Sequence, residues 1–330
     1  MKALINGRFL ARRVSGVERY GREILPWLAD RLRLVQPADQ AQGLRGHAWE
    51  QLCLPGQIRA GELLWSPANS GPLAVSNQVL TLHDLSPLEH PEWFKPAFAA
   101  WYRLFLPALI GRVKRVLTTS EYTRQKLLRR FALPAERVAC VPAGVDRDRF
   151  HPVAGPKEHY LLFVGTREPR KNLGGLLRAW KSVQDKFPGY QLVVAGGSGS
   201  VFREQQFPEH PERVRFPGYV PESELPSLMA RAALLILPSH EEGFGLPVLE
   251  AMACGTPVLA SRAGALPEVA GDAALLFDPA ETCALAAALE HCLGDPALLG
   301  SLREKGLERA AQFSWQRSAE ELWHNLEACQ

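Results

Sequence analysis

The sequence predicts an α/β protein with two Rossmann-like domains, and three observations support that prediction. Short apolar runs alternate with helix-period segments along the chain, which is the pattern of parallel sheets with crossover helices. A length of 330 residues fits two domains of about 100–200 residues each. Residues 151–158, His-Pro-Val-Ala-Gly-Pro-Lys-Glu, separate two strand-helix series and have the composition of a linker. We therefore expect domains at 1–155 and 156–330, facing across a cleft.

The first half contains the first strand-helix series. Five strands are expected where short apolar runs occur: 3–6, 63–66, 78–83, 115–119 and 137–141. Three helices are expected, one from the Ser15-Gly16 loop to about residue 32, one at about 95–111 and one at 121–131.

The second half repeats the pattern. Six strands are expected at 160–164, 192–195, 214–216, 234–237, 258–260 and 274–277. Three helical segments close the chain, at about 280–293, 296–311 and 315–328. Ligands of doubly wound sheets bind outside the carboxyl ends of the strands, so the loops after these strands are the expected site.

Charge is distributed unevenly between the two halves. The composition, 46% hydrophobic and 22% charged, is that of a globular protein and excludes a disordered chain. Residues 1–150 carry a formal charge of +9, whereas the remainder carries −6. A basic half suggests an anionic partner, which can be a phosphorylated substrate or a membrane surface. Nucleic acid is not expected, because the basic residues do not form a recognisable binding module.

The cysteine spacing and the lengths of the apolar runs indicate in which cellular compartment the protein is expected. The six cysteines form no C-x-x-C pair, so neither a zinc site nor a redox motif is predicted. The apolar run after Met1 is too short for a signal peptide, and the run near 104–110 is too short to span a bilayer. We expect a cytoplasmic protein, and a peripheral position on the cytoplasmic membrane face stays open.

The window 239–258, SHEEGFGLPVLEAMACGTPV, is the most informative in the sequence. It follows a buried strand, and Gly243 and Gly245 permit a tight turn before a helix whose first turn accommodates Pro247. Amides at a helix start suit a phosphate or a sugar hydroxyl. Glu242 and Glu250 supply two carboxylates that can accept hydrogen bonds from hydroxyl groups of a sugar and a ribose.

These residues resemble glycosyltransferase family 4, whose members share the GT-B fold and an E-x7-E motif in this context. The resemblance extends over nearly the whole chain, in order. Further family-like segments are SGV at 15–17, TLHDL at 81–85, TSEY at 119–122, VPAGVDRDRF at 141–150, YLLFVGTREPRKNL at 160–173, GYVPESEL at 218–225, AGALPEVAGDAA at 263–274 and FSW at 313–315. The fold it implies is two Rossmann-like domains, with the C-terminal helix crossing back to the first.

The resemblance implies that the glutamates of the window bind the donor. Glu242 would bind hydroxyls of the transferred sugar, and Glu250 would bind the ribose. The residues between them would lie against sugar and phosphate: Gly243, Phe244, Gly245 and Leu246.

It also implies roles for residues outside the window. Lys171, six residues after Gly165, matches the lysine that contacts the diphosphate. Gly16 would approach the phosphates closely, and His83 would lie near the reacting sugar carbon. The nucleobase would lie against backbone near Val220.

One position departs from the family pattern. Many members have arginine directly after the glycine that ends the strand at 160–164, and Thr166 stands there. Arg167 and Arg170 are both candidates to replace it, and we favour Arg170, because Arg-Lys-Asn occurs in a subgroup with this loop.

The mechanism implied by the resemblance retains the anomeric configuration and uses no metal. No His-x-x-His cluster occurs that would argue for one. The departing diphosphate would take the acceptor's proton in a front-face substitution, so that no protein nucleophile is needed. A cation at Lys171 would stabilise the charge that develops on the leaving group.

Structural alternatives remain for several of these residues. Glu242 and Glu250 would be solvated carboxylates if taken alone, His83 would be a hydrogen-bonded core imidazole, and Gly16 would be a turn glycine. The turn Gly196-Gly197-Ser198-Gly199 lacks the order of a dinucleotide fingerprint. In the segment 95–115, the aromatics would form core or, alternatively, would lie with its basic residues on anionic lipid.

The function predicted is transfer of a hexose, of mannose or rhamnose type, from a nucleotide-diphosphate sugar to a glycan or lipid-linked acceptor. The Thr166 variant and the stretch HDLSPLEHPEWF at 83–94 resemble those of mannosyl- and rhamnosyl-transferring relatives, and this resemblance favours a GDP-mannose-type donor. No cofactor is expected. The alternatives are an epimerase or phosphorylase of the same fold, and a catalytically silent nucleotide-sugar-binding or scaffold protein. The presence of Lys171 and both glutamates argues against the silent protein.

Overall fold

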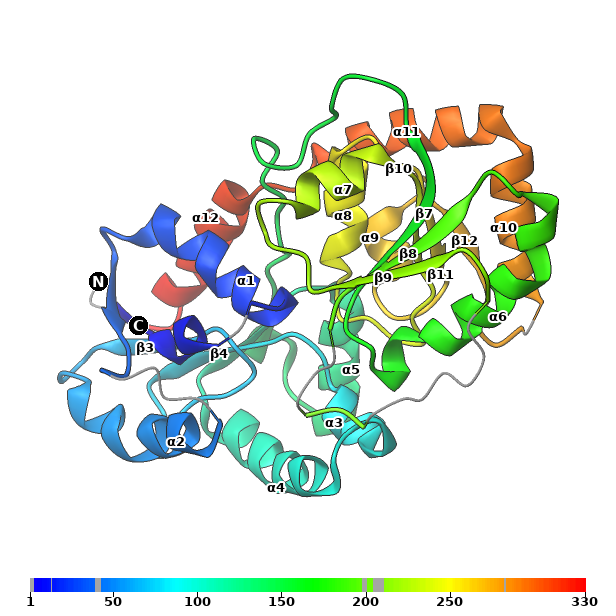
Figure 1. Cartoon of the computed structure of the whole chain (residues 1–330). Coiled ribbons are helices and arrows are strands. Elements are labelled where there is room, and N and C mark those ends of the chain that lie inside the picture. The colour runs from blue at the N-terminus through cyan, green and yellow to red at the C-terminus, as the bar shows by residue number, and fades with distance from the viewer. Residues whose placement is uncertain (1–2, 13, 39–42, 198–200, 204–210, 282) are drawn as a thin grey trace. The chain divides into compact units, whose positions relative to one another are not determined.

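A computed structural model of the chain describes residues 3–12, 14–38, 43–197, 201–203, 211–281 and 283–330. The chain forms two compact units, each built on a six-stranded parallel sheet with helices, as Figure 1 shows. The α/β prediction is confirmed. Unit 1 contains Met1–Glu89, Ala99–Gly144 and Ser314–Gln330, and unit 2 contains His90–Phe98 and Val145–Phe313.

Unit 1 has the strand order β2-β1-β3-β4-β5-β6. Its strands are β1 (Ala3–Asn6), β2 (Leu32–Val35), β3 (Leu63–Ser66), β4 (Gln78–Leu82), β5 (Arg115–Thr118) and β6 (Val138–Cys140). Its helices are α1 (Gly16–Ile24), α2 (Gly43–Ala48), α3 (Ser86–Glu89), α4 (Pro96–Arg112, which starts in unit 2), α5 (Glu121–Phe131) and α12 (Trp315–Glu327). The strand order reverses between β1 and β3, so the loops after these two strands diverge.

The sequence analysis was wrong about the segment after α1. It extended one helix to about residue 32, but α1 ends at Ile24 and a 3-10 helix, Leu25–Leu28, follows. Pro26 explains the break, because proline has no N–H to donate to the preceding helical turn. Strand β2, which lies at the sheet edge and contains Arg33, was missed, as were α2 and the adjoining π-helix Trp49–Cys53.

Unit 2 has the strand order β12-β11-β10-β7-β8-β9. Its strands are β7 (Glu158–Val164), β8 (Gln191–Ala195), β9 (Val214–Gly218), β10 (Ala232–Leu237), β11 (Val258–Ser261) and β12 (Leu275–Phe277). Its helices are α6 (Leu173–Val183), α7 (Leu225–Arg231), α8 (Leu246–Ala253), α9 (Leu266–Ala270), α10 (Ala284–Gly294) and α11 (Pro296–Ala310). All six expected strands are present, with ends shifted by up to two residues.

The core of unit 2 explains why its strands are apolar runs. The central strand β10 is buried at all six positions because helices cover both faces of the sheet. Helices α6 and α10 pack together on one core cluster that includes the buried Trp180, whereas α8 packs against α7, α9 and α11. Because the order reverses between β7 and β10, the loops after these strands form the switch point at which doubly wound sheets bind ligands.

The chain crosses between the units four times. The sequence analysis placed one boundary after residue 155, whereas the contacts divide the chain at Gly144 and Val145. The C-terminal segment from Ser314 belongs to unit 1, where α12 packs against α1. Ser314 caps α12 by accepting a hydrogen bond from Arg317 N at 3.2 Å. We name the segment His90–Phe98, which belongs to unit 2, the strap.

Candidate active site

The loops after β7 and β10 bring the predicted lysine and glutamate into contact. Glu242 is 5% exposed, and Lys171 Nζ lies 2.6 Å from its Oε1 atom. Ser239 Oγ donates to the same oxygen at 2.7 Å, and Arg170 donates to Oε2 at 3.4 Å. Burial alone raises the pKa of Glu242, but the charges of Lys171 and Arg170 outweigh burial and hold the pKa below its usual value. The site therefore keeps an ionised, buried carboxylate between two cations.

The arginine beside Glu242 is Arg170. Its guanidinium also contacts Glu168 Oε1 at 2.9 Å, and Thr166 Oγ1 donates to Glu168 Oε2 at 2.6 Å. Arg167 points elsewhere, with its guanidinium 5.0 Å from the ring centroid of Phe216. The carboxylate of Glu168, which is 1% exposed, therefore links Thr166 to Arg170. The sequence analysis missed Glu168. The signal available was its place in TREPRKN, because a carboxylate within a short segment that contains three cations is expected to pair with one of them.

Backbone contacts hold the two loops in place. His240 N donates to Arg170 O at 2.8 Å, which ties the loop after β10 to the loop after β7. Ala265 N donates to Glu242 O at 2.9 Å. A Cβ at Gly264, whose φ is +60°, would lie 2.4 Å from that oxygen, so only glycine fits at this position. Rigid loops of this kind fix the carboxylate before any ligand binds.

The glycine turn of the window leads into α8 as the sequence predicts. Gly245 has a φ of +99° and caps α8, whose first turn contains Pro247. Phe244 is buried with its ring centroid 6.1 Å from that of Phe313, and Gly243 and Leu246 complete the turn. Glu250 lies on α8 and is 4% exposed. Both glutamates of the motif are buried, so the alternative of two solvated surface carboxylates is excluded.

Close backbone approaches mark the ends of the neighbouring strands. Gly165 follows β7, and a Cβ on it would lie 3.6 Å from the Lys171 side chain. Gly196 N donates to Gly218 O at 2.7 Å, and a Cβ at Gly196 would lie 1.9 Å from Gly165 O. Val220 follows β9 in the next loop. Residues 198 and 199 of the expected glycine turn lie outside the described residues.

The remaining predicted residues, Gly16 and His83, belong to unit 1. Gly16 is the first residue of α1, and Ser15 before it forms a capping box with Glu18. His83 follows β4, is 8% exposed, and has its ring centroid 5.1 Å from that of Tyr20 on α1. The carboxyl edge of the first sheet thus brings these two predicted residues into one neighbourhood.

The strap contacts the loops after β10 and β8 of unit 2. His90 Nε2 lies 3.3 Å from Oε2 of Glu241, the neighbour of Glu242. Phe94 forms an antiparallel bridge with Phe202 in the loop after β8, and their ring centroids are 5.0 Å apart. The sequence analysis assigned this segment to the first domain, because the sequence of a loop does not indicate which distant residues the loop contacts.

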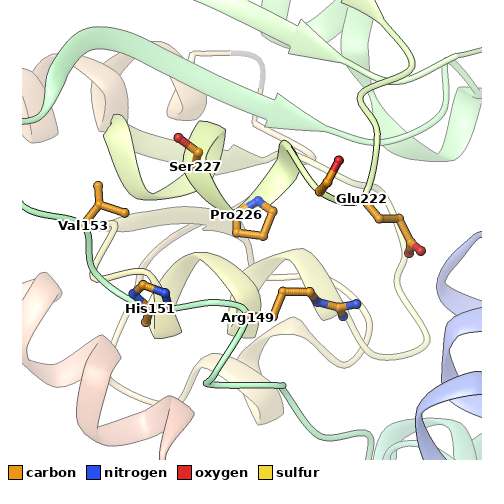
Figure 2. Close-up of a pocket in the computed structure, with 7 residues that line it drawn as sticks. Arg149, His151, Val153, Glu222, Pro226 and Ser227 are labelled. Atoms are coloured by element: carbon orange, nitrogen blue, oxygen red, sulfur yellow. The ribbon is translucent and has the colours of Figure 1, made fainter.

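A hollow of about 270 Å³ lies between the segment after residue 148 and the start of α7, as Figure 2 shows. Its lining comprises Arg149, His151, Val153, Glu222, Ser223, Pro226 and Ser227. None of these was a predicted site residue. Across the described ranges no group of three or more histidine, cysteine, aspartate or glutamate side chains could hold a metal ion.

Helix α4 contains the aromatic residues for which the sequence analysis left two roles open, core packing and contact with anionic lipid. Tyr102, Phe105 and Leu109 are buried in unit 1, which confirms a core role for these three. Trp101 is 46% exposed and Leu104 74% exposed. Over the part of the chain that the structure describes, no helix is long and apolar enough to cross a membrane.

Comparison with known proteins agrees with the fold. Residues 145–312 match the family model described as "Glycosyl transferases group 1", and residues 64–149 match "Glycosyltransferase Family 4". The two-sheet fold is that of a GT-B protein. The chain belongs to the group 1, or family 4, glycosyltransferases.

The relatives support the same assignment, and the solved structures support the fold. The chain is 32% identical over 309 residues to O-antigen chain mannosyltransferase B of Escherichia coli, covering 88% of this chain and 77% of the relative. It is 34% identical to the MMP alpha-(1->4)-mannosyltransferase of Mycolicibacterium hassiacum, covering 69% of this chain but only 57% of the relative. The fold matches sucrose-phosphate synthase from Thermosynechococcus elongatus with a TM-score of 0.77 at 24% identity, each chain covered to 99%. Anabaena HepE with UDP-glucose matches at 0.76 and 20% identity, over 99% of this chain and 100% of that one.

Proposed function

We propose that the chain is a retaining glycosyltransferase that moves a hexose of mannose or rhamnose type from a nucleotide-diphosphate sugar to a glycan or lipid-linked acceptor. The buried Glu242 held between Lys171 and Arg170 at the switch point of unit 2 is the observation that carries the proposal. The names of the related mannosyltransferases favour the sugar type, and the UDP-glucose complex of HepE favours a nucleotide-sugar donor.

The contacts of Lys171 suit a diphosphate. An ammonium group has three donors, and Glu242 is its one hydrogen-bond partner among the described residues. Two donors remain for phosphate oxygens as the leaving group gains charge. Donors that are already in place when this charge develops commonly lower the barrier more than any other single feature of an active site. The ionised Glu242 can accept hydrogen bonds from hydroxyls of the donor sugar at the same time.

The mechanism proposed needs no protein nucleophile and no metal. The bond from the anomeric carbon to the diphosphate breaks while the acceptor oxygen attacks from the same face. The departing diphosphate oxygen takes the acceptor's proton. Gly165, Thr166, Val220 and the turn 243–246 would line the donor, with Glu250 on the ribose and GDP as the favoured nucleotide.

The first test is donor binding. We expect the unfolding temperature to rise with one nucleoside diphosphate out of GDP, UDP, dTDP and ADP, because a ligand at a hundredfold excess over its Kd stabilises the fold by about 2.7 kcal/mol. Glu250→Ala should abolish the rise. Glu304→Ala, which removes an exposed carboxylate from α11 of the same unit, should leave it unchanged.

The outcomes separate the alternatives. A rise with NAD alone would overturn the glycosyltransferase proposal. A rise with a nucleoside diphosphate but no transfer to any glycan or lipid-linked acceptor would support the silent binding protein. Retention is read by NMR from the one-bond coupling between the anomeric carbon of the product and its proton, because H2 is equatorial in mannose and rhamnose and the H1–H2 coupling is small in both anomers.

We also propose that α4 rests on an anionic membrane surface. Trp101 and Leu104 are exposed on either side of Arg103, an arrangement that suits an interfacial helix. Each basic residue near an anionic surface contributes about 1 kcal/mol. We expect co-sedimentation with vesicles that contain anionic lipid, weakened by Leu104→Ala but not by Trp27→Ala, which alters a tryptophan 52% exposed outside α4. Equal sedimentation with neutral vesicles would refute the proposal.

A further inference from the structure

The loop after β3 holds His83 by both its backbone and its ring. His83 N donates to Asn69 Oδ1 at 2.7 Å, and His83 Nε2 lies 2.9 Å from the carbonyl oxygen of Pro67. Asn69 N donates in turn to Thr81 O on β4 at 3.2 Å. Asn69 has a φ of +58°, a left-handed conformation that asparagine tolerates better than most residues.

The contact with Pro67 fixes which ring nitrogen carries the hydrogen. A carbonyl oxygen can only accept, so Nε2 must donate and therefore carries the hydrogen. In a neutral imidazole the other nitrogen, Nδ1, is then an acceptor. Nδ1 of His83 has no hydrogen-bond partner among the residues that the structure describes. Burial lowers the pKa of His83, which favours the neutral ring.

The loop itself rests on a buried ion pair. Ser70, one residue after Asn69, accepts a hydrogen bond from Arg8 at 3.1 Å and donates one to Glu50 at 3.0 Å. Arg8 and Glu50 contact each other at 2.7 Å, and both are at most 5% exposed. The loop is therefore fastened on one side to the switch point of the first sheet and on the other to His83.

We propose that Asn69 is a positioning residue which, with the carbonyl of Pro67, fixes His83 as the Nε2–H tautomer, so that Nδ1 accepts a hydrogen bond from a substrate hydroxyl. The tautomer follows from unit 1 alone. The identity of the hydroxyl, one on the transferred sugar, rests on the proposed function. In this arrangement His83 recognises a hydroxyl donor and supplies no proton to the reaction.

The groups around the ring determine how it responds to pH. Tyr20 and Glu18 face it from α1, Asp84 follows it in the chain, and Thr123 on α5 donates to its carbonyl oxygen at 3.4 Å. The two carboxylates and the Pro67 contact raise the pKa of His83, but burial outweighs them. We expect the ring to titrate at a lower pH than an ordinary histidine, because burial lowers its pKa.

The test is a long-range ¹H–¹⁵N correlation spectrum of the full chain labelled at histidine, with His83→Gln to identify the signal. The expected spectrum at neutral pH is that of the Nε2–H tautomer, and the ring should titrate at a lower pH than an ordinary histidine. An Nδ1–H pattern, or titration near 6.5, would overturn the proposal. This NMR measurement requires neither a variant at Asn69 nor a substrate.

Variants at Asn69 test the positioning role. Asn69→Gly keeps the backbone conformation but removes the acceptor, and the ring should then exchange between tautomers and titrate closer to 6.5. The acidic limb of kcat/KM should move to higher pH with it. Asn69→Asp retains an acceptor oxygen and should restore the tautomer, whereas Ala132→Gly, at another left-handed position of the unit, should change neither readout.

The proposal and the proposed function can fail separately. A wild-type tautomer in Asn69→Gly would overturn the positioning role even if the chain transfers sugar. The predicted tautomer in a chain that no nucleoside diphosphate stabilises would support the positioning of His83 and overturn the proposed function instead.

Discussion

Lys171→Met is expected to lower the kcat of sugar transfer by about 10²–10³-fold, the usual effect of removing one preorganised donor to developing charge. The methionine keeps much of the side-chain volume and packing over Gly165 but removes the ammonium group 2.6 Å from Glu242. Arg170, at 3.4 Å from the other carboxylate oxygen, compensates only in part. The measurement is kcat at saturating donor.

The same substitution should also destabilise the fold, which must be separated from catalysis. Removing one partner of a buried pair leaves the other charge uncompensated and typically costs about 3–5 kcal/mol. Adding Glu242→Gln should recover much of that stability without recovering activity. Lys186→Met, which breaks a pair with side chains 62% and 38% exposed, should change stability by no more than about 1 kcal/mol. A double variant that regains activity would show that Lys171 acts through folding alone.

Glu50→Ala should destabilise unit 1 by about 3–5 kcal/mol, because it breaks a buried salt bridge from one side. Glu50 is 1% exposed, and its loss leaves Arg8 with its 2.7 Å partner missing. It also removes the acceptor of Asn6 at 2.7 Å and of Ser70 at 3.0 Å. The free energy of unfolding in urea measures the loss.

Two control variants test whether burial of the ion pair explains the size of this loss in unfolding free energy. Glu62→Ala removes the partner of Arg33, whose side chain is 32% exposed, and should cost less. The double variant Arg8→Met, Glu50→Leu should recover much of the loss, since an apolar pair of similar volume can replace a buried ion pair. Equal losses for Glu50 and Glu62 would contradict the importance given to burial.

His47, the neighbour of this pair, gives stability a dependence on pH. Burial, followed by the charges of Arg8 and Arg12, lowers the pKa of His47 to about 4. Its Nδ1 accepts from Arg8 at 3.1 Å, as a neutral ring must. The unfolded chain therefore binds more protons than the folded chain between about pH 6.5 and 4, and stability should fall as pH decreases through that window. His47→Gln should flatten this part of the curve.

Elements with a strong local signal could be predicted from the sequence. The helix expected at 121–131 is α5, because Ser120 caps it and its periodic apolar face is unambiguous. The loops that carry Lys171 and Glu242 were predicted because each follows a buried parallel strand, which forms an apolar run. Strand β2 was missed because an edge strand that includes Arg33 has neither an apolar run nor a clean alternation.

Fold class, family and the positions of the candidate residues could all be predicted from the amino-acid sequence, because they depend on patterns within short windows. Only the tertiary structure shows which side chains contact each other. Lys171 contacts Glu242, 71 residues away in the sequence, and Arg8 contacts Glu50, 42 residues away. The same is true of the strap, which lies in unit 2, and of Asn69, which holds His83. A buried charge or ring nitrogen must find a partner, and packing between distant segments supplies that partner where neighbours in the chain do not.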